Sequence, residues 1–173
     1  MQKTLISNDP RETTALATRL KESLKNGDVI LLTGEIGAGK SHFARSLIQA
    51  AMDNIEEVPS PTFTLVQTYD TTIGSIWHAD LYRLNDQSDI FELGLIDAFG
   101  NEIVLVEWPD RLGHLEPQDA LTVEITILEK NKRKITFSTT SSVTSNGNFI
   151  SSIVFSPNKV VPGFIMVYKF NLE

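Results

Sequence analysis

The fold of this chain is decided by residues 34–41, Gly34-Glu35-Ile36-Gly37-Ala38-Gly39-Lys40-Ser41. This stretch matches the phosphate-binding loop pattern G-x-x-x-x-G-K-[S/T] at every defined position. The apolar run 28–33 before it predicts a buried strand, and residues 42–51 after it predict a helix. A loop between a strand and a helix N-terminus directs free backbone N–H groups at an anion. The pattern and its context therefore predict a nucleotide-binding P-loop.

Each residue type in this loop has a chemical task. Glycines allow backbone angles that let the loop wrap closely around a phosphate. Lys40 supplies a positive charge to the β- and γ-phosphates, and Ser41 supplies a hydroxyl to Mg²⁺. The residues that we expect to contact the nucleotide are Glu35, Gly37, Ala38, Gly39, Lys40, Ser41 and His42.

The composition limits the class of protein. The 173 residues suffice for one domain, and the formal net charge of −7 argues against gripping nucleic acid through a basic surface. The absence of cysteine excludes disulfides and thiolate metal sites. Since the sequence has neither the apolar run of a signal peptide nor one long enough to span a membrane, we expect a cytoplasmic protein with no membrane partner.

Periodicity along the chain predicts alternating helices and strands. Asp9 and Pro10 have the form of a helix start. The expected elements after the P-loop are strands at 63–69 and 75–82 joined by a turn at 70–74, a helix at 86–99, a buried strand at 102–108, and a hairpin of 121–127 with 134–137. These predict an α/β, three-layer P-loop NTPase fold with a mixed, largely parallel sheet and antiparallel hairpins. Residues 1–140 form the expected domain, and residues 141–173 an atypical tail rich in Ser, Thr and Val.

A P-loop needs a second organiser of Mg²⁺, an acidic residue at the end of a neighbouring buried strand. Glu107 ends the apolar run 103–106 and has that position. We therefore expect Ser41 and Glu107 to be the metal ligands. Trp108 follows at once, and the sequence leaves open whether it covers the nucleotide or seals the core.

Asp80 and Thr62 are the candidates for catalysis besides Lys40. His78 and Asp80 share one face of an expected strand, where a carboxylate can orient an attacking water. The alternative for Asp80 is an ion pair with Arg83. Thr62 lies in a rigid Pro-containing loop of the kind that senses a γ-phosphate in many P-loop proteins, and a plain turn is the alternative.

Four motifs in a fixed order give the chain a family resemblance. They are residues 34–41, Ser60-Pro61-Thr62-Phe63-Thr64-Leu65-Val66, His78-Ala79-Asp80-Leu81-Tyr82-Arg83-Leu84 and Val106-Glu107-Trp108-Pro109. Over about residues 5–137 the chain resembles the TsaE family, the small P-loop ATPases of bacterial tRNA threonylcarbamoyladenosine biosynthesis. Two features depart from the family: Ser41 stands where Thr is usual, and the tail is unlike the usual ending.

The resemblance implies an ATPase that does not itself modify RNA. Its implied partners are a threonylcarbamoyltransferase subunit and its paralogous non-catalytic partner, which modify adenosine 37 of tRNAs reading ANN codons, so that tRNA is reached only indirectly. It also implies that Ser41 and Glu107 hold Mg²⁺, Lys40 holds the phosphates, Asp80 serves hydrolysis and Trp108 lies near the nucleotide.

Two other functions fit the same loop. A nucleotide-dependent binding module would bind ATP without turnover, and a small-molecule P-loop kinase would need an Arg-rich lid that the sequence does not show. A GTPase would need an N-K-x-D motif, and Asn131-Lys132-Arg133-Lys134 lacks its final carboxylate.

Overall fold

A seven-stranded mixed sheet forms the middle layer of the molecule. The computed structural model describes residues 1–84, 86 and 88–139, and the expected tail at 141–173 lies outside this range. The strand order is β1-β7-β6-β2-β5-β4-β3. The strands are β1 (Gln2–Ser7), β2 (Val29–Thr33), β3 (Val66–Thr71), β4 (Gly74–Asp80), β5 (Ile103–Glu107), β6 (Leu121–Ile127) and β7 (Arg133–Ser138).

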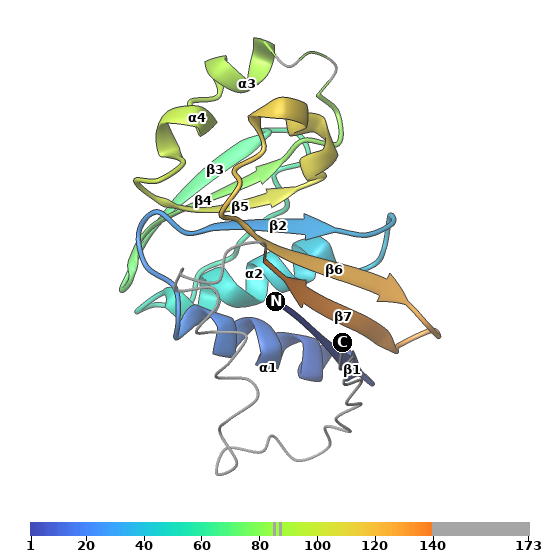
Figure 1. Ribbon diagram of the computed structural model, residues 1–173. Coiled ribbons are helices and arrows are strands. Elements are labelled where there is room, and N and C mark those ends of the chain that lie inside the picture. The colour runs from blue at the N-terminus through green and yellow to red at the C-terminus, as the bar shows by residue number, and fades with distance from the viewer. Residues whose placement is uncertain (85, 87, 140–173) are drawn as a thin grey trace.

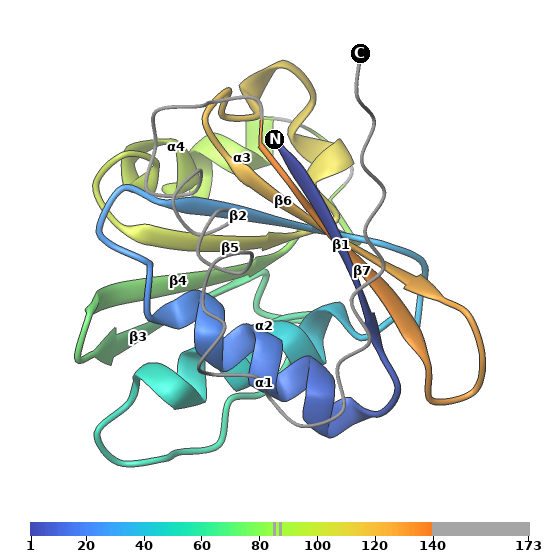
Figure 2. The ribbon, with the colours of Figure 1, turned by 60° about the horizontal axis from the view of Figure 1, so that its bottom comes forward.

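Helices cover both faces of the sheet and make the three layers (Figures 1 and 2). One face carries α1 (Pro10–Lys21) and α2 (Lys40–Ala51), and the other carries the short helices α3 (Ser88–Glu92) and α4 (Leu95–Ala98). A 3-10 helix, η1 (Pro109–Leu115), follows β5. Among the described residues, no helix is both long and apolar enough to cross a membrane.

The four central strands, β6, β2, β5 and β4, run parallel, and the pairs at both edges are antiparallel. The carboxyl ends of parallel strands meet at one edge of a sheet, where open α/β sheets bind ligands. The P-loop leaves that end of β2, and Asp80 and Glu107 end β4 and β5 beside it. The predicted α/β, three-layer fold class is confirmed.

Alternation along the strands divides the core into two clusters. Ile76 and Leu105 pack toward α1 and α2, whereas Ala79 and Val106 pack toward α3 and α4. Because successive side chains alternate between faces, His78, Asp80 and Glu107 lie on the α2 side of the sheet. The packing of the apolar residues thus places these three polar side chains near the start of α2.

The predicted helix start and both hairpins are confirmed. Asp9 caps α1 by accepting hydrogen bonds from the backbone N–H groups of Arg11 and Glu12. The hairpins are β3 with β4 and β6 with β7. β1 was not predicted, and it pairs with β7, which is distant in sequence, from Gln2↔Ser138 to Ser7↔Arg133.

Three predicted elements were wrong in part. The strand expected at 63–69 begins only at Val66, because residues 61–64 form a turn and Leu65 has a positive φ of 65°. The expected turn at 70–74 is correspondingly shorter, since β3 continues to Thr71 and β4 begins at Gly74. The helix expected at 86–99 is two short helices, because Gly94 takes a φ of 72° between them.

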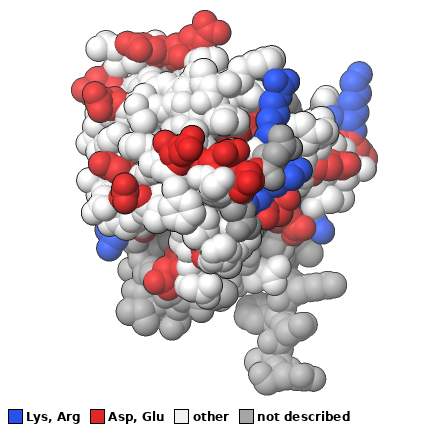
Figure 3. Space-filling model, turned by 90° about the horizontal axis from the view of Figure 1, so that it is seen from above, with Lys and Arg blue, Asp and Glu red and all other residues white. Residues whose placement is uncertain are grey.

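The face over α3 and α4 shows how charge is distributed on this side of the molecule. Acidic side chains form several groups across it, and most of the basic ones lie on one side (Figure 3). The described part of this face therefore offers no continuous basic surface of the kind that grips nucleic acid directly.

Candidate nucleotide-binding site

A cavity of about 340 Å³ lies where the P-loop meets the ends of β4 and β5. It is lined by Ile36, Gly37, Gly39, Lys40, Ser41, His42, Thr62, Asp80, Tyr82, Glu107 and Trp108. The residues come from stretches far apart in the sequence that the parallel sheet brings to one edge. This cavity contains most of the residues that the sequence predicted as site residues.

The backbone of the P-loop has the form of a phosphate cradle. Gly37 has a φ of 77°, and Gly39 has a φ of 114° as the N-cap of α2. At both positions a Cβ would project into open space with no described atom within 4 Å. Glycine is therefore required by the positive φ angles, and the free space beside the backbone lets an anion approach the amides closely.

Lys40 is held across the loop by three contacts. Its Nζ donates to the backbone oxygens of Gly34 at 2.7 Å and Glu35 at 3.0 Å, and lies 3.8 Å from the centroid of the Trp108 ring. Burial lowers the pKa of Lys40, and the charges of nearby carboxylates, first among them Glu107, partly oppose this shift. The ammonium is thus held over the P-loop by backbone oxygens and an aromatic ring.

Glu107 connects the P-loop helix to β4 through both of its carboxylate oxygens. Ser41 Oγ donates to Oε2 at 2.9 Å, and His78 Nε2 donates to Oε1 at 2.9 Å. A carboxylate oxygen only accepts, so His78 carries its proton on Nε2, and Nδ1 remains without a described partner. His78 and Glu107 are almost fully buried, with side chains 1% and 2% exposed.

The residues present fit Mg²⁺. The Ser41 hydroxyl and the Glu107 carboxylate are hard oxygen ligands placed together beside the phosphate cradle. Within the described residues, no three His, Cys, Asp or Glu side chains gather as a metal site of their own. Mg²⁺ is usually held by one or two protein ligands together with substrate phosphates and water.

Asp80 is tied to the loop that contains Thr62. Thr62 Oγ1 donates to Asp80 Oδ2 at 2.9 Å, and the Tyr82 N–H donates to Oδ1 at 3.1 Å. Ser60 Oγ lies 2.9 Å from Thr62 Oγ1 and extends this network. The alternative ion pair with Arg83 is not formed, since the Arg83 guanidinium lies over the Phe63 ring, 4.3 Å from its centroid.

Trp108 lines the cavity because its backbone is turned sharply at the end of β5. Its φ of 59° and ψ of 53° are left-handed, which is uncommon for a bulky residue. This conformation places the ring over Lys40 and 4.9 Å from the ring of Tyr82, measured between centroids. The ring of Trp108 thus lines the cavity beside Lys40, and its predicted role of covering the nucleotide stays a prediction.

Comparisons with known proteins agree with this geometry. The model of the family "Threonylcarbamoyl adenosine biosynthesis protein TsaE" matches residues 7–135. The chain belongs to the TsaE family. A TsaE of Rickettsia felis is 39% identical over 148 residues, which are 86% of each chain. A TsaE of Aquifex aeolicus is 40% identical, over 77% of this chain and 93% of its own.

A solved structure shows the same fold. The crystal structure of YdiB from Bacillus subtilis has a TM-score of 0.71 and 25% sequence identity, and the likeness covers 89% of this chain and 95% of that one. The TsaE resemblance that four sequence motifs predicted is therefore confirmed over most of the chain.

Some predicted contact residues of this TsaE chain do not line the cavity with a side chain. The side chain of Ala38 is buried, and Glu35 contributes its backbone oxygen to Lys40. His42 lines the cavity, but its Nε2 lies 3.0 Å from Thr14 Oγ1 and 3.1 Å from the Pro10 oxygen. His42 therefore also fastens the start of α2 to α1.

The sequence did not predict three residues of the site. Tyr82 and Ile36 line the cavity, and His78 holds Glu107. Tyr82 follows Asp80 in a turn just beyond the end of β4, so the alternation of the strand does not place it. The partner of His78 depends on the register of β4 against β5, which no local pattern gives.

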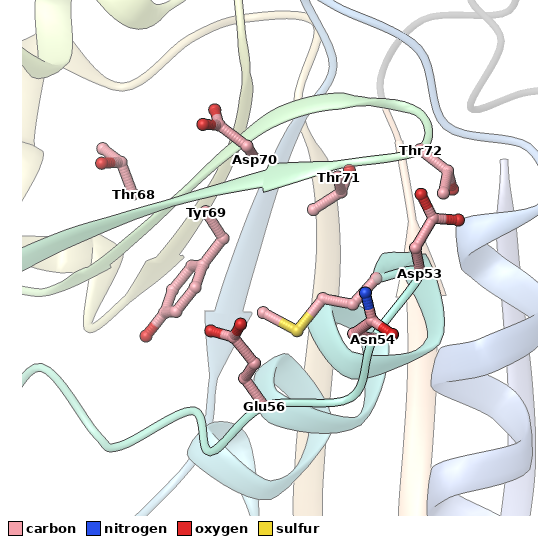
Figure 4. Close-up of a pocket in the computed structure, with 9 residues that line it drawn as sticks. Asp53, Asn54, Glu56, Thr68, Tyr69, Asp70, Thr71 and Thr72 are labelled. Atoms are coloured by element: carbon pink, nitrogen blue, oxygen red, sulfur yellow. The ribbon is translucent and has the colours of Figure 1, made fainter.

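A second cavity, of about 510 Å³, lies beside the edge strand β3. Asp53, Glu56 and Asp70 are among the residues that line it (Figure 4), and Tyr69 and Asp70 point to opposite sides of the strand. Carboxylates repel a polyphosphate, and this cavity lies away from the amides of the P-loop. It does not resemble a second nucleotide site.

Proposed function

We propose that this chain binds ATP with Mg²⁺ and hydrolyses it to ADP and phosphate. We further propose that this cycle serves the threonylcarbamoyl modification of adenosine 37 in tRNAs reading ANN codons. One observation carries the proposal: the P-loop, the hydrogen-bonded pair of Ser41 and Glu107, and the hydrogen-bonded pair of Asp80 and Thr62 all line one cavity. Membership of the TsaE family supplies the biological process.

Binding rests on the P-loop amides, Lys40 and the metal ligands. The amides and the Lys40 ammonium hold the phosphate oxygens, and Ser41 and Glu107 hold Mg²⁺. Bound Mg²⁺ would neutralise charge on the β- and γ-phosphates. The ring of Trp108 lies next to Lys40, in position to cover the nucleotide.

Hydrolysis rests on Asp80. Its Oδ2 accepts from Thr62 and its Oδ1 from the Tyr82 N–H, so the carboxylate is held in one orientation at the cavity wall. A fixed carboxylate can orient a water molecule and accept its proton as the water attacks the γ-phosphate. Thr62 fixes the carboxylate and is itself open to the cavity, where it can contact the γ-phosphate.

The action on tRNA is indirect in this proposal. With a net charge of −7, the chain is poorly suited to gripping RNA on its own. We propose that it works through a threonylcarbamoyltransferase subunit and its paralogous non-catalytic partner, as the family resemblance implies. The cavity is open to solvent at Ile36, which is 69% exposed, so that a partner can complete the site.

The test is to measure ADP and free phosphate produced from ATP by the chain alone and with the transferase pair. We expect ADP and free phosphate in equal amounts. The transferase pair should increase the amount of both products, and Lys40→Ala should abolish their formation. Nucleotide binding without turnover, even beside the partners, would establish a binding module instead. With candidate small-molecule acceptors added, ADP without free phosphate would indicate a small-molecule kinase that transfers the phosphoryl group to one of them.

A further inference from the structure

The turn between β6 and β7 lies beside the P-loop, although some 90 residues separate the two in sequence. Figures 1 and 2 both show this turn next to the loop that follows β2. Arg133, the first residue of β7, makes the connection. It belongs to residues 131–134, the segment that fails as a guanine-reading motif.

Arg133 uses all three guanidinium nitrogens on backbone oxygens. On the P-loop side, Nε donates to the Ala38 oxygen at 2.8 Å and Nη2 to the Gly37 oxygen at 3.4 Å. On the hairpin side, Nη1 donates to the oxygens of Glu129 at 3.1 Å and Lys132 at 3.1 Å, with a longer bond of 3.3 Å to Lys130. The planar guanidinium thus bridges two backbone segments that do not pair with each other.

A second contact binds the same hairpin to the P-loop. The space in which a Cβ of Gly34 would lie is filled by the backbone oxygen of Ile125 in β6. The first glycine of the P-loop is therefore needed for close packing against β6. The contact at Gly34 holds the start of the P-loop against the β6–β7 hairpin, and the bonds of Arg133 hold the middle of the P-loop against the same hairpin.

We propose that Arg133 is a positioning residue for phosphate binding, which holds the Ala38–Gly39 peptide of the P-loop so that its amide faces the anion. A trans peptide unit points its C=O and N–H in opposite directions. Arg133 holds the Ala38 carbonyl and does not line the cavity, so the N–H of Gly39, in the same peptide unit, is turned toward the cavity. This inference rests on the proposed function of nucleotide binding.

A direct attraction of the phosphate by the Arg133 charge is the competing explanation. Lysine separates the two, because it keeps the charge but lacks the planar fork that reaches both segments. Arg45 offers a matched control, since its Nε donates to the backbone oxygen of Val58 at 2.8 Å, away from the P-loop. Removing either guanidinium costs the protein a bond of the same kind.

The experiment titrates a fluorescent ADP analogue into the full chain and into Arg133→Ala, Arg133→Lys and Arg45→Ala, with Mg²⁺ and with a chelator. Losing charge-assisted bonds to the loop is expected to weaken binding by roughly tenfold to a hundredfold in both Arg133 variants. The loss should be equal with and without Mg²⁺, since it acts through the amides. Arg45→Ala should bind the ADP analogue with the affinity of the unchanged protein. Thermal melts without nucleotide, recorded for the unchanged protein and the three variants, control for folding.

Three outcomes would overturn the inference. The first is unchanged affinity in Arg133→Ala, and the second is full affinity in Arg133→Lys, which would assign the effect to charge alone. The third is an equal loss in Arg45→Ala, which would mark a general structural effect. If Arg133→Ala does not fold, Arg133→Lys decides the matter. Absence of ADP binding by the unchanged protein would contradict the proposed function as well.

Discussion

At the scale of single residues, Lys40 carries the charge that the phosphate cradle needs. Only 5% of the residue is exposed, and its ammonium is fixed by the Gly34 and Glu35 oxygens and the Trp108 ring. Because a buried ammonium with fixed donors loses little conformational freedom when an anion arrives, we expect its contact with a phosphate to be strong.

Lys40→Ala is therefore expected to abolish ATP-dependent activity. Losing a charge-assisted contact costs about 1.5–3 kcal/mol of binding free energy, and roughly tenfold to a hundredfold in affinity. Calorimetric titration of ATP and a phosphate-release assay measure the two effects, with a thermal melt as the control for folding. Undiminished hydrolysis by this variant would refute the P-loop assignment.

Glu107→Gln is expected to weaken the Mg²⁺ dependence more than the fold. The amide keeps the shape and one acceptor oxygen but loses the charge that attracts the cation. The measurement is the Mg²⁺ midpoint of ATP hydrolysis beside a thermal melt. In His78→Asn the shorter side chain no longer reaches Oε1 of Glu107, so the Mg²⁺ midpoint should shift in the same direction. An unchanged midpoint in Glu107→Gln would mean that Glu107 is structural.

At the scale of elements, the P-loop depends on the strands on both sides of it. β2 pairs with β6 and β5, and the contact of Gly34 with the Ile125 oxygen fixes where the loop leaves the sheet. The backbone of Gly34 also has a φ of 136°, a conformation that residues with a Cβ avoid. Gly34 is thus constrained twice, by its angle and by its neighbour.

Gly34→Ala is expected to destabilise the fold by more than about 1 kcal/mol, because alanine meets both constraints. Gly100→Ala is the matched control, since Gly100 has a φ of 82° with open space around its Cβ position. Urea unfolding of the two variants measures the difference in free energy of unfolding. Equal losses would show that the close approach to Ile125 is not the determinant.

Elements with a strong local pattern could be predicted from the sequence, and those that depend on distant partners could not. The apolar runs of β2 and β5 and the alternation of β6 gave nearly correct boundaries. β1 was missed because its stability comes from pairing with β7, which begins about 125 residues later. Residues 86–99 were predicted to form a single helix, because the apolar spacing does not reveal that the backbone of Gly94 takes a left-handed conformation.

At the scale of the whole molecule, the site is a product of sheet topology. The sequence motifs predicted the site residues Lys40, Ser41, Asp80 and Glu107. The strand order β2-β5-β4 brings these residues together at one edge of the sheet. The sequence could not predict the bonds of His78 to Glu107 or of Arg133 to the P-loop. Both depend on how strands far apart in the sequence lie against each other.

The most direct test of the central claim separates binding from hydrolysis in Asp80→Asn, assayed with the transferase pair. ATP affinity should be retained, because the P-loop amides, Lys40 and the metal ligands are unchanged. Turnover should fall by about 10²–10⁴, the usual contribution of a general base. Binding and turnover that fall together, or an unchanged rate of phosphate release, would contradict the assignment of Asp80 as the residue that orients the attacking water.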